Sequence, residues 1–218
     1  MSLTLTLSNP NGIVMSADRR ITNMVKCDIK SATSRYDSSQ KLFLTKSGHG
    51  ISYTGSMKLD DGMSVSAIIK YALDTLDSTS MSVKDELIYI KKKLNEHKNI
   101  GIISMTGAEV LNGIGHIYST ELLDNNYSDF VEDESNGNAA TLYYGGEKEL
   151  FEKLLTTLDR NFLSFPLQTS VDFLRFLNQT VATSQYFSDT PQTISMSCDI
   201  LVIDNCGAHW FISPEQPQ

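Results

Sequence analysis

The chain has little cysteine, no excess of basic residues and no long apolar run. Its three cysteines, Cys27, Cys198 and Cys206, are widely spaced and odd in number. We therefore expect no disulfide framework, a reducing compartment and a cytoplasmic location. With 18 Lys and Arg against 26 Asp and Glu, the net charge is −8, which argues against nucleic acid or an anionic membrane as a partner. No apolar run approaches the roughly 18 residues of a membrane-spanning helix, so none is expected.

Histidine is also scarce, and its spacing argues against a metal centre. The four histidines are His49, His97, His116 and His209, and no two of them lie at the short separations typical of metal ligands. Each is expected on the surface or in a turn. The sequence therefore predicts no metal site.

What is present is typical of one soluble globular unit. Apolar residues make up 40% and charged residues 20% of 218 residues, enough to bury one sizeable core. Apolar spacing predicts four helices, at about 57–76, 83–97, 147–160 and 168–184. It predicts strands at 3–8, 12–17, 40–45, 50–54, 99–106, 109–118, 194–203 and 208–213. The polar, acidic stretch 120–138 is expected to form an exposed loop.

This order of elements predicts both the fold class and the domain organisation. Strands, two helices, strands, two helices and strands follow one another without a linker or a repeat, so residues 1–218 are expected to form a single domain. Two sheets packed face to face, with a helix pair on each outer side, would bury every apolar face. The prediction is an α+β fold, specifically a four-layer αββα sandwich.

Three segments near the start of the chain carry residues suited to catalysis. They read GIVMSADRRIT at 12–22, QKLFL at 40–44 and YTGS at 53–56. The first is a strand running into Asp18, the second opens a strand with Lys41, and the third ends a strand at Gly55. An acid, a lysine and a glycine turn near the start of a chain are the parts of an N-terminal nucleophile hydrolase, in which the α-amine of a Ser, Thr or Cys is the base for its own side chain.

The same segments resemble the proteasome β-type subunits. GIVMSADRRIT is similar to that family's G-V-V-x-A-A-D-x-R-A-T, and Lys41 precedes Gly55 by 14 positions, as the family lysine precedes its glycine. The family acid lies 16 positions after the nucleophile, which here points to Ser2. The resemblance covers about residues 2–56 and is looser beyond. Bacterial HslV- and Anbu-type proteins look most similar, because they too place the nucleophile directly after the initiator methionine.

Two nucleophiles follow from this alignment. Removal of Met1 would make Ser2 N-terminal, with an amine near pKa 8 to take the hydroxyl proton; the alternative is a disordered terminus. Met1-Ser2-Leu3 could also be an expression leader. The native start would then lie near Thr4, two residues short of the family spacing, and Thr4 shares the strand face of Ser2. Thr4 is therefore the second candidate.

The resemblance also implies roles for residues beyond the nucleophile. Lys41 would lower the pKa of the terminal hydroxyl and amine, and Asp18 would hold it in place; the alternatives are a solvated strand-end lysine and a turn aspartate bonding its own backbone. The N–H of Gly55 would stabilise the oxyanion. The alternative for Gly55 is a helix-start glycine, with Ser56 capping the next helix.

Further site positions are carried over less directly. Arg20 and Thr22 would lie beside the substrate, with Thr22 bonding its backbone, or would be structural only. The family has Gly-Ser-Gly before its third helix, where this chain has Tyr144-Gly145-Gly146, so Gly145 replaces a supporting serine. Asp189 and Thr193 lie where the family has an Asp and a Ser, with spacing that differs by one residue. Either Thr193 replaces the lost hydroxyl, or the site is impaired.

The resemblance implies a peptidase that uses no metal and no cofactor. It would cleave peptide or unfolded-protein substrates through an acyl-enzyme, inside a self-compartmentalising homo-oligomeric ring, with an ATPase unfoldase as an additional partner. Two alternatives remain open: a non-catalytic ring subunit or scaffold, favoured by Gly145, and a small-molecule amide hydrolase on the same fold.

Overall fold

The computed structural model describes residues 2–25, 32–76, 80–97, 101–123, 126–127, 131–135, 139–156, 158, 161–188 and 192–213. Helices are α1 (Val65–Thr75), α2 (Val83–Leu94), α3 (Glu149–Leu155) and α4 (Leu167–Tyr186), with a 3-10 turn η1 at Phe162–Ser164. Strands are β1 (Leu3–Asn9), β2 (Gly12–Asp18), β3 (Ile21–Val25), β4 (Ala32–Tyr36), β5 (Leu42–Leu44), β6 (Gly50–Gly55), β7 (Ile102–Leu111), β8 (Ile114–Leu123), β9 (Asn126–Tyr127), β10 (Val131–Ser135), β11 (Thr141–Gly146), β12 (Cys198–Asp204) and β13 (Gly207–Ile212).

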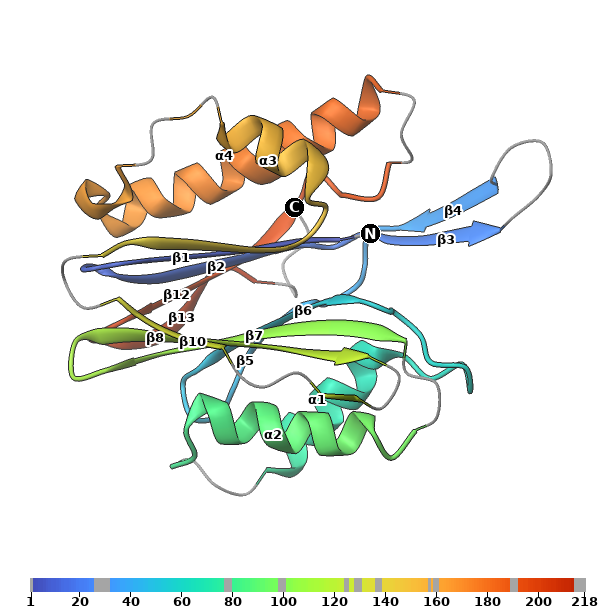
Figure 1. The fold of residues 1–218 in the computed structure, drawn as a ribbon, viewed down its shortest axis with the longest axis horizontal. Helices are drawn as coiled ribbons and strands as arrows, with labels where there is room; N and C mark the ends of the chain where they lie inside the picture. The colour runs from blue at the N-terminus through green and yellow to red at the C-terminus, as the bar shows by residue number, and fades with distance from the viewer. Residues whose placement is uncertain are drawn as a thin grey trace.

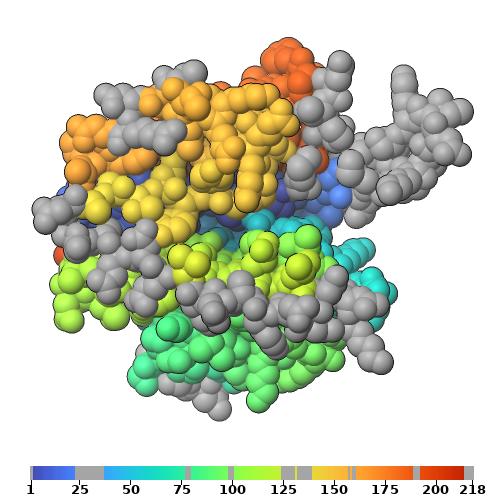
Figure 2. Space-filling view, viewed as in Figure 1, coloured from blue at the N-terminus to red at the C-terminus, as the bar shows by residue number. Residues whose placement is uncertain are grey.

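Two antiparallel sheets form the centre of the molecule. The first runs in the order β11-β1-β2-β12-β13, and the second runs β10-β8-β7-β6-β5, with β9 also paired to β8. In Figure 1, α3 and α4 lie over the first sheet, α1 and α2 lie under the second, and the β3–β4 hairpin projects from one end. Figure 2 shows the two helix pairs on opposite sides of the molecule. The two sheets and four helices agree with the predicted α+β class.

Alternation along β1 and β2 distributes apolar side chains between separate cores. Leu3, Leu5 and Leu7 pack with residues of α3 and α4, while the opposite faces of β2 and β12 pack against the second sheet through Met15 and Leu201. A third core lies between the second sheet and the pair α1 and α2. Because successive residues of a strand point to opposite faces, every residue of β1 is buried. The start of β1 is thereby enclosed, with α3 and α4 on one face of its sheet and the second sheet on the other.

Several predicted boundaries are wrong. The first helix begins at Val65 and not near 57, because Lys58 bridges to Ser64 and closes an excursion before the helix. The hairpin predicted at 99–106 and 109–118 turns later, at Asn112 and Gly113, which both have positive φ. An Asn-Gly pair between strands is the usual signature of such a turn.

The stretch 120–138 is not simply a loop, as its polar composition suggested. Strand β8 continues to Leu123, and β10 pairs with β8 from Val131↔Ser119 to Ser135↔Gly115. Charged residues are common on an edge strand, where they discourage pairing with other chains. The polar composition of this stretch therefore gave no sign of the strand β10 at the sheet edge. The strands β3, β4 and β11 were also not predicted.

In the part of the chain that the structure describes, no helix combines the length and the apolar character needed to cross a membrane.

The described cysteines are a buried Cys198 and an exposed Cys206, neither of them in a disulfide, and Cys27 lies outside the described residues. Burial raises the pKa of the Cys198 thiol to about 12. The Cys198 thiol is therefore a poor nucleophile at neutral pH.

Candidate active site

The candidate site is organised around the carboxylate of Asp18, at the end of β2. Oδ1 accepts hydrogen bonds from the backbone N–H of Leu3 at 2.8 Å and from Lys41 Nζ at 2.9 Å. Oδ2 accepts from the N–H of Arg20 at 2.9 Å and from that of Ser195 at 3.4 Å. The Asp18 side chain has no exposure to solvent. Three backbone N–H groups and one ammonium therefore hold a fully buried carboxylate in a single orientation.

Lys41 lies directly before β5 and is buried completely, so the alternative of a solvated strand-end lysine is wrong. Besides Asp18, its ammonium donates to the carbonyl of Arg20 at 2.6 Å. Its own carbonyl accepts from the N–H of Tyr53 at 3.1 Å. Burial raises the pKa of the Tyr53 phenol to about 12, so that neighbour stays neutral. Asp18 also accepts a hydrogen bond from the N–H of Arg20, two residues later in the chain. It therefore has both the turn role considered for it and the pairing with Lys41.

Ser2 lies at the entry to β1 and is anchored from two directions. Its carbonyl accepts from the N–H of Glu147 at 2.8 Å, and the next residue, Leu3, bonds Asp18. Only 1% of Ser2 is exposed, so the alternative of a disordered terminus is wrong. Gly146 has φ +98, and a Cβ there would lie 1.7 Å from the Ser2 carbonyl oxygen. Glycine is therefore required where β11 meets the start of β1.

Gly145, at the position where the resemblance led us to expect a supporting serine, lies in a confined place. It pairs with Thr4 across β1 and β11. A Cβ at this glycine would lie 2.9 Å from Oγ1 of Thr4 and 3.2 Å from Oγ1 of Thr54. Both threonines are buried. The space that a serine side chain would need is thus filled by two other hydroxyl groups.

Gly55 ends β6 with φ +106, and a Cβ there would lie 2.1 Å from the Ile102 carbonyl oxygen. The glycine is thus required by its own sheet, whatever else it does. The alternative in which Ser56 caps the following helix is wrong, because α1 begins at Val65 after Ser64. Thr54, the residue before Gly55, faces Gly145, which brings the end of β6 close to the start of β1.

Arg20 and Thr22 lie at the base of the β3–β4 hairpin. Arg20 donates from Nε and Nη2 to the two carboxylate oxygens of Asp37, each at 2.7 Å, and this contact raises the pKa of the guanidinium. Oγ1 of Thr22 is buried and has no hydrogen-bond partner among the described residues. A buried, unsatisfied hydroxyl is costly, so Thr22 has a hydrogen bond to offer a bound molecule.

Of the later candidates, Thr193 is not brought to Asp18. Thr193 is fully buried, but its hydroxyl and N–H both bond the side chain of Gln185 on α4. Asp189 lies outside the described residues. Ser195, which the sequence did not single out, contacts Asp18 through its N–H and accepts from the N–H of Arg19 at 2.9 Å. Ser195 lies two residues after Thr193. A shift of two positions in the comparison with the family's serine would have found it.

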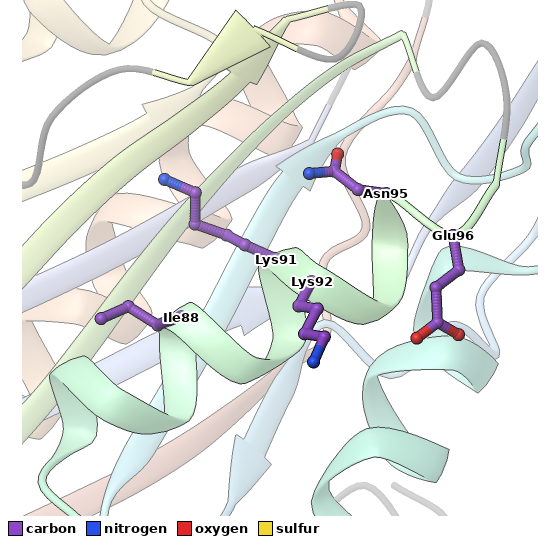
Figure 3. A pocket seen from close by; sticks show the side chains of 5 residues that line it. All are labelled: Ile88, Lys91, Lys92, Asn95 and Glu96. Carbon is purple, nitrogen blue, oxygen red and sulfur yellow. The ribbon is translucent and has the colours of Figure 1, made fainter.

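Nothing comparable is found at the hollow along α2, which is lined by Ile88, Lys91, Lys92, Asn95 and Glu96 (Figure 3). Lys91 there donates to the hydroxyl of Thr120 at 2.9 Å. The hollow holds no Ser, Thr or Cys beside a base. Among the described residues, no group of three His, Cys, Asp or Glu side chains is placed to hold a metal ion.

Comparison with known proteins gives a likeness in structure without one in sequence. No family model matches the chain, and no curated protein matches it. Among solved structures, the Anbu (Gly-1) mutant from Hyphomicrobium sp. strain MC1 is similar, with a TM-score of 0.58 and 13% identity over 94% of this chain and 82% of that one. At this identity the likeness shows the fold. The chain therefore has a fold similar to that of this Anbu protein.

Proposed function

We propose that this protein is a proteasome-like N-terminal nucleophile peptidase with Ser2 as its nucleophile. The observation that carries the proposal is the buried pair of Lys41 and Asp18, joined at 2.9 Å beside the first residues of β1. A lysine with no solvent exposure costs desolvation energy, and its packing position at the start of β5 does not require a charge. The helix pair, sheet, sheet and helix pair of Figure 1 support assignment to the four-layer αββα architecture.

The mechanism begins with removal of Met1, which leaves a free amine on Ser2. That amine takes the proton of Ser2 Oγ as the oxygen attacks the substrate carbonyl carbon. The N–H of Gly55 stabilises the resulting oxyanion, and the positive charge of Lys41 favours the ionised hydroxyl. The α-ammonium returns the proton to the leaving amine as the C–N bond breaks. Water then hydrolyses the ester on Ser2, and the amine is regenerated.

Substrate binding is assigned to the base of the β3–β4 hairpin. The unsatisfied hydroxyl of Thr22 would bond the backbone of an extended peptide, and Arg20, fixed by Asp37, would border the same path. The chain would act in a homo-oligomeric ring that encloses the site, with an ATPase unfoldase feeding it. Light scattering that finds only a monomer of 24.2 kDa at micromolar concentration would reject the ring.

The experiment compares a chain whose Ser2 is processed with one that carries an uncleavable N-terminal extension. Intact mass first establishes whether Met1 is removed. We expect turnover of a fluorogenic peptide, and covalent addition of a β-lactone to residue 2, in the processed form alone. Equal activity of the two forms would exclude the N-terminal mechanism, and labelling at Thr4 would identify the second candidate.

A second function is favoured by one observation. The serine that supports the nucleophile in the family is replaced by Gly145, and Thr4 and Thr54 occupy the space around it. A non-catalytic ring subunit or scaffold would tolerate this replacement. A processed Ser2 that neither turns over peptide nor accepts the β-lactone, in a chain that still assembles into a ring, would establish this alternative.

A further inference from the structure

A second buried ion pair lies directly behind the first. Arg19, the neighbour of Asp18, donates from Nε to Oδ1 of Asp199 at 2.6 Å, and its Nη2 lies 2.5 Å from the same oxygen. Asp199 is on β12, in register with Ala17 of β2, and has no exposure to solvent. Its other carboxylate oxygen, Oδ2, has no hydrogen-bond partner among the described residues.

Arg19 connects the two segments that supply partners to Asp18. Its N–H donates to Oγ of Ser195 at 2.9 Å, and Ser195 in turn donates its own N–H to Asp18. Its carbonyl accepts from the N–H of Ser39 at 3.0 Å, two residues before Lys41. The backbone of Arg19 thus determines where both segments lie.

The side chain of Arg19 is held as firmly as its backbone. Nη2 also donates to the carbonyl of Ser213, beyond the end of β13, at 2.7 Å. The guanidinium is thus held by the carboxylate of Asp199 and by a backbone carbonyl. From the geometry we infer that Asp199 is a positioning residue, which acts through Arg19 to fix the Asp18–Lys41 pair and to set its local charge. The consequence for Ser2 rests on the proposed function; the coupling to Lys41 does not.

The charge of Asp199 changes within an accessible range of pH. Burial, the largest effect, raises its pKa to about 6, opposed by Arg19 and Lys41 and reinforced by Asp18. The titratable and charged groups facing it are Arg19, Asp18 and Lys41, with the thiol of Cys198 beside it on β12. Above that pH these two aspartates balance the two cations. Below it, one positive charge is left over next to the proposed nucleophile.

The test follows the resonance of Lys41 Cε in the full chain with 13C-labelled lysine, assigned with Lys41→Arg, between pH 4.5 and 9. We expect an inflection near pH 6 in the parent. Asp199→Asn keeps an acceptor for Arg19 but removes the titration, so the inflection should vanish. Asp37→Asn, which makes the same change beside the adjacent arginine in an exposed pair, should keep it. A parent without this inflection, or an inflection that survives in Asp199→Asn, would overturn the inference whether or not other variants fold.

Labelling of residue 2 by a β-lactone separates this inference from the proposed function. With Asp199 neutral, the surroundings of the α-amine are more positive, so its pKa should fall and the acid side of the labelling profile should move to lower pH by about one unit in Asp199→Asn. Labelling with an unchanged profile would reject the positioning role and leave the function standing. The expected Lys41 titration without any labelling would reject the function and leave the positioning role standing.

Discussion

Two buried clusters of charge differ in how completely they are satisfied. At the end of β2, Asp18 accepts from three backbone N–H groups and from the ammonium of Lys41. Between the second sheet and α2, His49 lies between two buried carboxylates, with Nδ1 2.9 Å from Glu86 and Nε2 3.1 Å from Glu109. Oε1 of Glu109 has no partner among the described residues, so the contacts of this carboxylate are all made through Oε2.

This difference in hydrogen bonding indicates which of the two clusters has a fixed geometry. A carboxylate with every lone pair occupied is held in one position, as a group that orients a neighbouring cation must be. A carboxylate with a vacant oxygen in an apolar layer is costly and tolerates neutralisation. The first cluster is therefore expected to lose the most stability when it is changed. The second is expected to lose less, or to gain when its incompletely bonded carboxylate is neutralised.

The largest effect is expected for Lys41→Met, which leaves Asp18 buried without its cation. Removing one partner of a buried pair costs about 3–5 kcal/mol, and hydrolysis should be lost as well. Chemical denaturation and peptide turnover measure the two effects. Lys92→Met, on the exposed side of α2, is the control and should stay within about 0.5 kcal/mol of the parent.

The next effect is a pH dependence of stability contributed by Asp199. Its pKa is raised in the folded chain, from 3.8 to about 6, so folding favours its protonated form. This contribution is fully present below pH 4 and is lost as the pH rises through about 6. The loss is about 3 kcal/mol at 1.36 kcal/mol per unit. Asp199→Asn should be more stable than the parent at pH 8 but not at pH 4; denaturation curves that differ equally at both values would contradict this.

A smaller loss is expected for His49→Gln. The two N–H donors of a glutamine amide are on one nitrogen, so they cannot reach both carboxylates as the two ring nitrogens of His49 do. Glu86 and Glu109 would lose a shared partner, and the loss should cost about 2 kcal/mol at pH 7. Thermal melting at pH 7, with His97→Gln on the exposed Asp61 contact as the control, measures this difference.

The smallest effect is expected for Glu109→Gln, which brings the second cluster to one carboxylate and one imidazole. The change should lie within about 1 kcal/mol of the parent, on the stabilising side. Denaturant midpoints for Glu109→Gln and Asp18→Asn should therefore move in opposite directions. A similar loss in both variants would show that the two clusters do not differ in the way their hydrogen bonds indicate.

The sequence predicted the part of the site that depends on local pattern. Strand alternation placed Ser2 and Thr4 on one face, and an acid and a lysine at strand ends were correctly expected to meet. It could not predict partners that come from distant segments. Ser195 reaches Asp18 only because β12 pairs with β2, and Glu147 reaches Ser2 only because β11 pairs with β1.

The same limit explains the errors in the fold. Edge strands such as β10 carry polar residues whose pairing depends on the neighbouring strand and not on their own pattern. His49 was expected on the surface or in a turn. It does lie in the turn between β5 and β6, but it is buried, because α2 and β7 each bring a carboxylate to it. A histidine in a glycine-rich turn gives no local sign of either partner.

The position of β1 between β2 and β11 has a consequence for the time at which the site can form. Strand β2 follows β1 in a hairpin, but β11 begins at Thr141, and Ser195 comes later still. Contacts between residues so far apart in sequence form slowly, and during synthesis they cannot form until most of the chain has been made. A nascent chain would hold its first residue on one side only. The proposed nucleophile would therefore be completed at the end of folding, and an unfinished subunit would not cleave its neighbours.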